Sequence, residues 1–359
     1  MRIARVETRV VELPLVEPYT IAYESVSRAI NVVVTLETDD RPRRLVGIGC
    51  AAPDAHVTGE TPESVVAVVG DVVEPRLRGE DPLRWRRLLE SLRADLSAHR
   101  SAFAAIDMAL LDLLGKICDR PLWQLLGGYR ESIETSITIG ILPEAETVSA
   151  ARDAVERGFR CLKLKGGSDV DADVARVRRV REAVGAEVEL RFDANQGFTR
   201  GEAVRFARRT VGAGLELLEQ PTAAAELERL GRVTHGVELP VMADESLRTR
   251  RDAFRLAEGR LVDMVNLKVM KVGGIGNALE IESVAQMAGI ESMVGCFDES
   301  EIGIAAGLAV ALARPNVVYA DLDGHLDLAD DPAAGSLRLE DGRLFAPTTP
   351  GLGVSLAGL

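Results

Sequence analysis

The chain has 359 residues, 47% of them hydrophobic, and a formal net charge of −13 at pH 7. This length and composition suffice for a large domain and a smaller one with buried cores. The acidic balance argues against a nucleic-acid partner, because phosphate binding requires basic patches. The N-terminus lacks the apolar stretch of a signal peptide, and no run approaches the roughly 18 apolar residues of a membrane span. Four cysteines without CxxC spacing are typical of reduced thiols, so we expect a cytoplasmic protein with no membrane partner.

The first 125 residues are predicted to form a separate α+β domain, because strand-like segments precede helices. The strand-like segments are 3–13, 30–38 and 45–52. One helix is expected to begin after Thr61, which is followed by a proline in the first helical position. Another covers 101–117, whose broad apolar stripe suits a buried helix. The tail, 325–359, contains a strand pair joined by an Asp-Gly turn and is expected to complete this domain.

Residues 126–324 alternate short apolar strands with amphipathic helices. The predicted strands are 133–141, 161–166, 188–196, 215–221, 241–246, 264–269, 292–298 and 317–324. Helical segments lie between them, and the one at 201–214 follows Thr199 and Glu202, which have the spacing of a capping box. Eight strands with helical connections indicate an α/β fold, a parallel β/α (TIM) barrel. A doubly wound open sheet is the alternative.

Most of these strands end in a charged or amide residue, and the carboxyl ends of the strands carry the chemistry in a β/α barrel. These residues are Lys163, Lys165, Asp193, Asn195, Glu219, Asp244, Lys268, Asp321 and Asp323. Asp193, Glu219 and Asp244 come from consecutive strands, which lie about 4.8 Å apart, so their carboxylates can converge. A set of oxygen ligands suits Mg²⁺, whereas the lack of His or Cys in the cluster disfavours zinc.

Lysines flank this predicted metal site on both sides. Lys163 and Lys165 share one face of their strand because side chains alternate with period two. A lysine with an ordinary pKa of about 10.4 is a poor base at neutral pH. A neighbouring ammonium and a nearby cation both lower that pKa. We therefore expect Lys163 to perturb Lys165, and Lys165 to act as the base.

The motifs together resemble the enolase superfamily, in its muconate-lactonizing subgroup, over nearly the full chain. The matching segments are KLK (163–165), DANQG (193–197), EQP (219–221), ADES (243–246), NLKVMKVGG (266–274) and a helical bridge at 107–128. The resemblance implies an N-terminal capping domain on a modified (β/α)₇β barrel. It also implies one Mg²⁺ at the three acids, with Lys165 and Lys268 as opposed acid and base. The reaction shared by this superfamily begins with removal of a proton α to a carboxylate, and Mg²⁺ stabilises the enediolate.

The segment DLD (321–323) narrows the predicted reaction. Asp321 and Asp323 share a face of the last predicted strand and form an anionic pocket. This pair resembles that of dipeptide epimerases, where it binds the ammonium group of the substrate. The predicted function is therefore an isomerase, a dipeptide epimerase that inverts the α-carbon of the second residue by 1,1-proton transfer. The alternative for Asp321 and Asp323 is that they simply face solvent. The alternatives for the function are a muconate cycloisomerase or o-succinylbenzoate synthase, and a non-catalytic barrel that binds a metal or assembles into oligomers.

Three further acids suggest the substrate. Glu24 lies in the capping segment where relatives acting on Ala-Glu carry an arginine, and Asp54 lies in another capping loop. Asp298 lies on the seventh predicted strand, where such relatives carry an apolar residue. Together they are expected to attract dipeptides that contain Lys or Arg and to repel a glutamate side chain. Ala-Glu or a hydrophobic dipeptide is the alternative substrate, and a homo-oligomer is expected.

Overall fold

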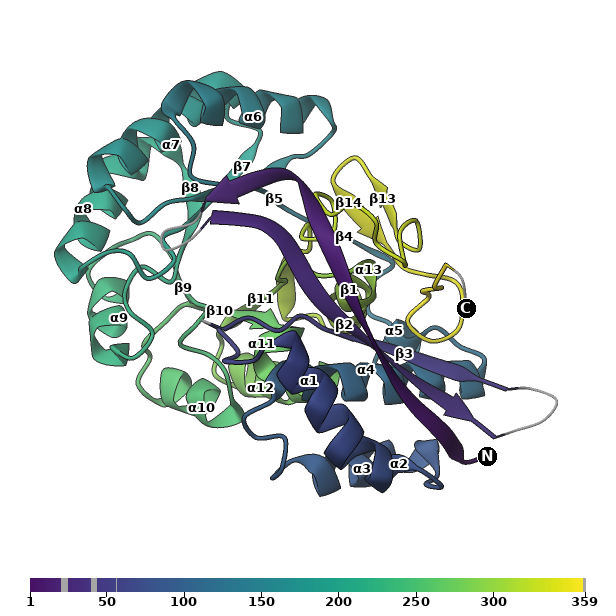
Figure 1. Cartoon of the computed structure of the whole chain (residues 1–359). Coiled ribbons are helices and arrows are strands. Elements are labelled where there is room, and N and C mark those ends of the chain that lie inside the picture. The colour runs from purple at the N-terminus through teal and green to yellow at the C-terminus, as the bar shows by residue number, and fades with distance from the viewer. Residues whose placement is uncertain (21–24, 40–43, 56, 358–359) are drawn as a thin grey trace.

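The structure is a computed structural model that describes residues 1–20, 25–39, 44–55 and 57–357. A parallel sheet of eight strands, β5 to β12, runs through its centre, and the strand order follows the chain order (Figure 1). The strands are β5 Ile137–Ile139, β6 Cys161–Lys165, β7 Glu189–Asp193, β8 Leu215–Glu219, β9 Val241–Ala243, β10 Met264–Lys268, β11 Glu291–Gly295 and β12 Val317–Asp321.

Helices follow every strand of this sheet except the last. They are α6 Glu144–Glu156, α7 Val170–Val184, α8 Arg200–Thr210, α9 Leu227–Thr234, α10 Arg250–Glu258, α11 Val269–Val272, α12 Ile275–Met287 and α13 Glu301–Ala313. The predicted capping box is present, because Thr199 accepts a hydrogen bond from the Glu202 N–H and the Glu202 side chain accepts one from the Thr199 N–H. This alternation, together with a strand order that follows the chain without the reversal of a doubly wound sheet, confirms the predicted (β/α)₇β barrel.

The prediction of a single strand over 133–141 is wrong. The structure divides this segment into β4, Ser132–Glu134, and β5. Between them, the Thr135 N–H donates to the Gly342 carbonyl at 2.9 Å, and the Ser136 N–H donates to the Ala320 carbonyl at 3.2 Å. The two residues thus bond in different directions, one toward the C-terminal tail and one toward β12. The second bond joins the first barrel strand to the last.

The N-terminal segment forms an antiparallel sheet covered by helices. Its elements are β1 Ile3–Thr20, β2 Ser25–Thr38, β3 Val46–Ala51, α1 Pro62–Val68, α2 Glu74–Leu77, α3 Trp85–Leu92, α4 Arg100–Cys118 and α5 Leu122–Leu125. As predicted, Thr61 caps α1. The central helix α4 packs directly on β3, where a Cβ on Gly49 would lie 1.9 Å from the Ala105 carbonyl oxygen. Glycine is therefore required for this close approach of two backbones.

The C-terminal tail connects the capping helix and the barrel. Its hairpin, β13 Arg338–Glu340 and β14 Arg343–Phe345, pairs with β4. Further along, the Leu352 N–H donates at 2.8 Å to Asp112 on α4, and the same carboxylate accepts the Ile48 N–H of β3 at 2.9 Å. Gly351 has a φ of +77°, and an added Cβ would lie 2.0 Å from this carboxylate. The division of the chain at residue 125, with the tail assigned to the capping domain, stays a prediction.

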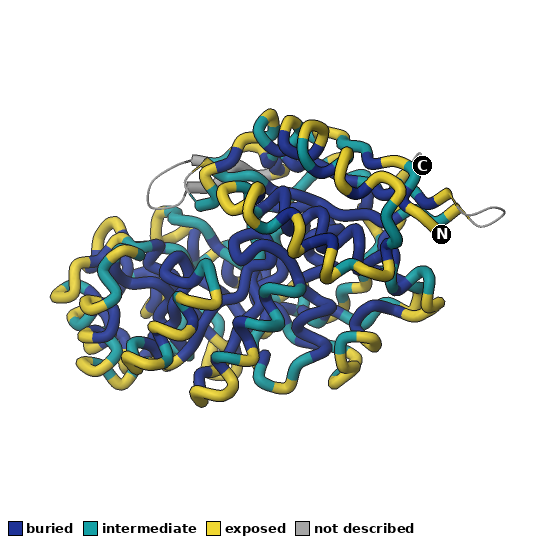
Figure 2. The backbone as a smooth tube through the Cα atoms, turned by 90° about the horizontal axis from the view of Figure 1, so that it is seen from below, coloured by how far each residue is buried: buried dark blue, intermediate teal, exposed yellow. Residues whose placement is uncertain are grey.

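The main cluster of buried hydrophobic residues extends from the barrel into the capping elements, and a second cluster lies within the capping elements themselves (Figure 2). Exposed residues lie mostly on the outer faces of the helices and in the connecting loops. None of the helices among the described residues is long and apolar enough to cross a membrane.

Candidate active site

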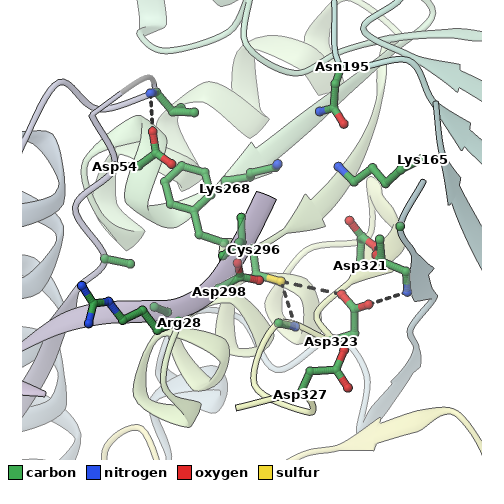
Figure 3. A pocket seen from close by; sticks show the side chains of 18 of the residues that line it. Arg28, Asp54, Lys165, Asn195, Lys268, Cys296, Asp298, Asp321, Asp323 and Asp327 are labelled. Carbon is green, nitrogen blue, oxygen red and sulfur yellow. Dashed lines mark hydrogen bonds between the residues drawn. The ribbon is translucent and has the colours of Figure 1, made fainter. Parts of the chain in front are cut away.

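A cavity of about 710 Å³ opens where the carboxyl ends of the barrel strands meet the capping elements. Its barrel side includes Lys165, Lys268 and Asp321, and its capping side includes residues 26–31 of β2 and the loop at Asp54 (Figure 3). Each of these three barrel residues stands at the last position of its strand. The fold therefore brings together residues that are far apart in the sequence.

Three carboxylates converge beside this cavity, and one of them, Asp244, is among the residues that line it. Asp193 and Glu219 end β7 and β8 and are paired neighbours in the sheet, and Asp244 directly follows β9. Each is buried, and each offers an oxygen within 4.8 Å of the other two. This is the cluster that the consecutive strand ends predicted.

One oxygen of each carboxylate is held from outside the cluster. The bonds are Asn195 N–H to Asp193 Oδ1 at 2.8 Å, Asn266 Nδ2 to Glu219 Oε1 at 2.7 Å and Lys271 Nζ to Asp244 Oδ1 at 2.6 Å. The second oxygens face a lysine: Asp193 Oδ2 lies 2.6 Å from Lys165, Glu219 Oε2 lies 3.1 Å from Lys163, and Asp244 Oδ2 lies 2.9 Å from Lys268. The carboxylates are thus oriented with one oxygen outward and one inward.

The inward oxygens suit a hard divalent cation. Three carboxylates in one buried cluster repel each other, and a cation with oxygen preference relieves that repulsion. Glu219 Oε2, despite its contact with Lys163, makes no hydrogen bond with the described residues, and neither does Asn195 Oδ1 nor Glu245 Oε2. Buried oxygens of this kind normally have a partner. The donor set therefore fits a divalent metal ion that prefers oxygen ligands.

Lys165 and Lys268 approach from opposite sides, and Figure 3 shows their amino groups pointing toward one another. Lys165 extends from β6, whereas Lys268 ends β10 and also lies over the Phe297 ring, 5.5 Å from its centre. Burial and the Lys163 ammonium would lower the pKa of Lys268, but the Asp244, Glu219 and Asp193 carboxylates together outweigh them and raise that pKa well above its usual value. A cation that shares the charge of Asp244 weakens this upward effect.

Lys163 is buried among three carboxylates, in addition to being a neighbour of Lys165 on β6. Its side chain is fully enclosed, and its ammonium lies 2.5 Å from Asp321, 3.1 Å from Glu219 and 3.5 Å from Asp193. Burial favours a lower pKa, but the three carboxylates outweigh it and raise the pKa of Lys163 well above the usual range. Lys163 therefore neutralises buried acids, while its predicted effect on Lys165 stays a prediction.

Asp321 and Asp323 both line the cavity, but their surroundings differ. The prediction that both lie on the last strand is wrong, because β12 ends at Asp321. Asp323 follows the strand, and its Oδ2 accepts the Thr138 N–H at 2.6 Å. Although burial acts in the opposite direction, the Lys163 ammonium lowers the pKa of Asp321 to about 2. Burial and the nearby Asp321 charge raise the pKa of Asp323 to about 7. Asp321 is thus committed to Lys163, and Asp323 is the less compensated acid.

The predicted specificity residues are only partly described. Asp54 and Asp298 line the cavity, whereas Glu24 lies outside the described residues. Asp54 also accepts the Val57 N–H at 2.6 Å, which stabilises its loop. Arg28 and Asp327 are among the charged lining residues that had not been predicted.

Sequence reasoning also missed the groups that hold the acids. Asn266 stands two positions before Lys268 on the same strand, so period two could have placed it beside the cluster. Lys271 follows Lys268 by three residues, which places both on one side of a helical turn. For Arg28 and Asp327 we find no comparable signal, because neither occupies the end of a barrel strand.

Comparison with known proteins agrees with this geometry. A family model described as "Mandelate racemase / muconate lactonizing enzyme, N-terminal domain" matches residues 4–127, and one described as "Enolase C-terminal domain-like" matches residues 146–358. The L-Lys-D/L-Arg epimerase of Methylococcus capsulatus is 41% identical over 99% of this chain and 99% of its own length. The L-Ala-D/L-Glu epimerase of Bacillus subtilis is 36% identical over 100% and 98%.

A solved structure of the Methylococcus capsulatus dipeptide epimerase, complexed with Mg and the dipeptide L-Arg-D-Lys, superposes with a TM-score of 0.95 at 41% identity. It covers 99% of both chains. A capped barrel with an acidic cluster between two lysines defines a member of the enolase superfamily. The chain belongs to its mandelate racemase and muconate lactonizing enzyme family, among the members similar to dipeptide epimerases. It is an isomerase, as predicted.

Proposed function

We propose that the chain is a Mg²⁺-dependent dipeptide epimerase that inverts the α-carbon of the second residue by 1,1-proton transfer. The observation that carries this proposal is the pair of lysines at opposite sides of one cavity, each ion-paired to an acid of the same cluster. One base permits only removal and return of a proton on the same face. Two opposed bases permit inversion.

The protons balance over one turnover. Lys165 begins as a neutral amine and removes the α-proton from one face of the substrate, and the electron pair of the C–H bond moves into the carboxylate. Lys268 begins as an ammonium and donates its proton to the other face as the electron pair returns. Lys165 ends protonated and Lys268 ends neutral, which is the arrangement required for the opposite epimer.

The acidic cluster and the last strand would hold the two ends of the substrate. A divalent cation held by Asp193, Glu219 and Asp244 would bind the substrate carboxylate and stabilise the negative charge that develops on its oxygens. Asp323, at the far side of the cavity, would accept the α-ammonium of the first residue (Figure 3). Fixing both ends of the dipeptide places its second α-carbon between the lysines.

The cavity lining favours cationic side chains. Acidic side chains outnumber basic ones in the lining, and Asp54, Asp298 and Asp327 lie beyond the two catalytic lysines. The relative from Methylococcus capsulatus carries the name L-Lys-D/L-Arg epimerase, which supports the same substrate class. We therefore propose that dipeptides containing Lys or Arg are preferred.

Arg28 favours a second candidate, an L-Ala-D/L-Glu epimerase. Its side chain reaches the cavity from β2 and could pair with a glutamate carboxylate. However, Arg28 is exposed and already lies 3.7 Å from Glu12. An exposed arginine with a carboxylate beside it offers less attraction than a desolvated one.

The epimerase proposal is tested by deuterium uptake from D₂O into a panel of dipeptides. Wild-type enzyme is expected to exchange and invert the second α-carbon. Lys165→Ala and Lys268→Ala are each expected to lose inversion, and each is expected to exchange the α-proton of only one epimer. Full inversion by either variant would contradict the two-base mechanism.

The substrate preference is tested by kcat/KM for Ala-Lys and Ala-Glu. A desolvated like-charge contact costs several kcal/mol, so a ratio of about a hundredfold in favour of Ala-Lys is expected. Asp298→Asn should reduce this ratio mainly through KM. Glu63→Gln, which removes an exposed acid outside the cavity, is the matched control and should leave it unchanged. A wild-type preference for Ala-Glu would favour the second candidate and leave the epimerase proposal intact.

A further inference from the structure

Lys271 is a buried lysine with no place in the proton transfers. It lies in the short helix α11, three residues after Lys268, and only 1% of it is exposed. It does not line the cavity, so it has no access to a substrate. A lysine is rarely buried in this way unless its charge has a partner.

The ammonium group of Lys271 has three donors, and all three are used. Two go to Asp244, at 2.5 Å to the backbone carbonyl and 2.6 Å to Oδ1 of the side chain. The third goes to the backbone carbonyl of Asn266 at 3.0 Å. One side chain thus joins the end of β9 to β10 and fixes both the backbone and the carboxylate of the same acid.

Lys271 and Lys268 contact different oxygens of the Asp244 carboxylate. Lys271 holds Oδ1, and Lys268 lies 2.9 Å from Oδ2. The bonds from Lys271 to Oδ1 and to the backbone carbonyl oppose rotation of the carboxylate, so Oδ2 keeps its direction toward Lys268 and the cluster. Asn266, which accepts the third bond, donates from its side chain to Glu219 at 2.7 Å, so the same arrangement extends to a second acid.

We propose that Lys271 is a positioning residue that orients Asp244 for the divalent cation, an inference that rests on the metal site of the proposed function. Groups that hydrogen-bond to metal ligands fix their orientation, and their loss typically weakens metal binding about 10–100-fold. A residue with only a structural role would affect stability without affecting metal affinity. The two roles are therefore separable by experiment.

The chain offers a matched control in Lys116. Its ammonium donates at 2.6 Å to the Asp112 carboxylate and at 2.7 Å to the Val46 carbonyl, so it also joins a carboxylate to a backbone carbonyl. This pair lies between α4 and β3, outside the cavity lining. Lys116→Met and Lys271→Met therefore remove similar bonds at different places.

The experiment measures Mn²⁺ binding to EDTA-treated full-length enzyme by calorimetry, together with the melting temperature. Lys271→Met is expected to raise the Kd for Mn²⁺ about 10–100-fold, and Lys116→Met is expected to lower the melting temperature while changing that Kd less than about twofold. If Lys271→Met does not melt cooperatively, Lys271→Gln replaces it. Gln keeps a polar group but is one atom shorter, and the same loss of affinity is expected.

The possible outcomes separate this inference from the proposed function. A Lys271 variant that binds Mn²⁺ as tightly as wild type would overturn the positioning role while leaving epimerisation intact. If Lys271→Met binds Mn²⁺ more weakly but the wild-type enzyme exchanges no α-proton of any dipeptide, the positioning role is supported and the epimerase proposal is contradicted. Wild-type enzyme that binds no Mn²⁺ would overturn both.

Discussion

Replacing Lys163 by Met should destabilise the protein strongly, because it removes the cation from a buried group of acids. The Lys163 ammonium lies 2.5 Å from Asp321 and 3.1 Å from Glu219, and all three side chains are almost fully buried. Removing one partner of a buried ion pair typically costs about 3–5 kcal/mol, since the other charge is left uncompensated. Methionine fills nearly the same volume, so the loss reflects charge rather than a cavity.

The pKa of Asp321 gives a separate measure of the stability that its ion pair with Lys163 contributes. Its pKa is about 2, against an ordinary value of 3.8. A difference of nearly two units corresponds to about 2 kcal/mol of stability from this acid alone. Because the folded-state pKa is the lower one, this contribution is present above pH 4 and is lost as the pH falls toward 2. We therefore expect Lys163→Met to lower the free energy of unfolding by about 3 kcal/mol at pH 7.

Urea unfolding of EDTA-treated enzyme, with and without Asp321→Asn, tests this reasoning. The double variant should lose less stability than the sum of the single variants, because the amide that replaces the Asp321 carboxylate carries no charge that could be left uncompensated. Added Mg²⁺ should recover part of the loss in Lys163→Met, since a cation neutralises the remaining acids. A loss below about 1 kcal/mol in Lys163→Met, or strict additivity, would refute the assigned role of this ion pair.

Three further predictions concern the metal, pH and packing. EDTA should abolish activity and Mg²⁺ or Mn²⁺ should restore it, except in Asp244→Asn, and full activity after chelation would exclude a metal role. Burial lowers the pKa of His325 to about 4; since the unfolded value is higher, stability should fall as the pH drops from about 6.5 to 4, and urea unfolding of His325→Gln should show a smaller fall. Gly49→Ala should lower the melting temperature by forcing β3 away from the carbonyl of Ala105, at a cost of about 1–3 kcal/mol, and an unchanged melting temperature would contradict that contact.

The centre of the site was predictable because it follows from local rules. Period two places Lys163 and Lys165 on one face of β6, and the carboxyl ends of parallel strands share one edge. These rules together with the motifs are enough to bring Asp193, Glu219 and Asp244 to one place. No knowledge of side-chain packing was needed.

The missed features depend on partners that are distant in the sequence. The break between β4 and β5 arises because Thr135 and Ser136 bond to the tail and to β12, about which their own apolar pattern carries no information. The commitment of Asp321 to Lys163 likewise joins residues 158 positions apart. Such long-range contacts form only when the barrel closes, and the local sequence propensity does not encode them.

The bonds at Asp112 have a consequence for the order of folding during synthesis. Its carboxylate accepts the N–H of Ile48 and also that of Leu352, which lies 240 residues further along the chain. A nascent N-terminal segment can form its sheet and helix α4 early, since domains generally begin to fold as they emerge. One side of this buried carboxylate, however, stays without its partner until the ribosome has translated the whole barrel and most of the C-terminal tail. Helix α4, which packs on the N-terminal sheet, therefore acquires its last hydrogen bond only near the end of synthesis.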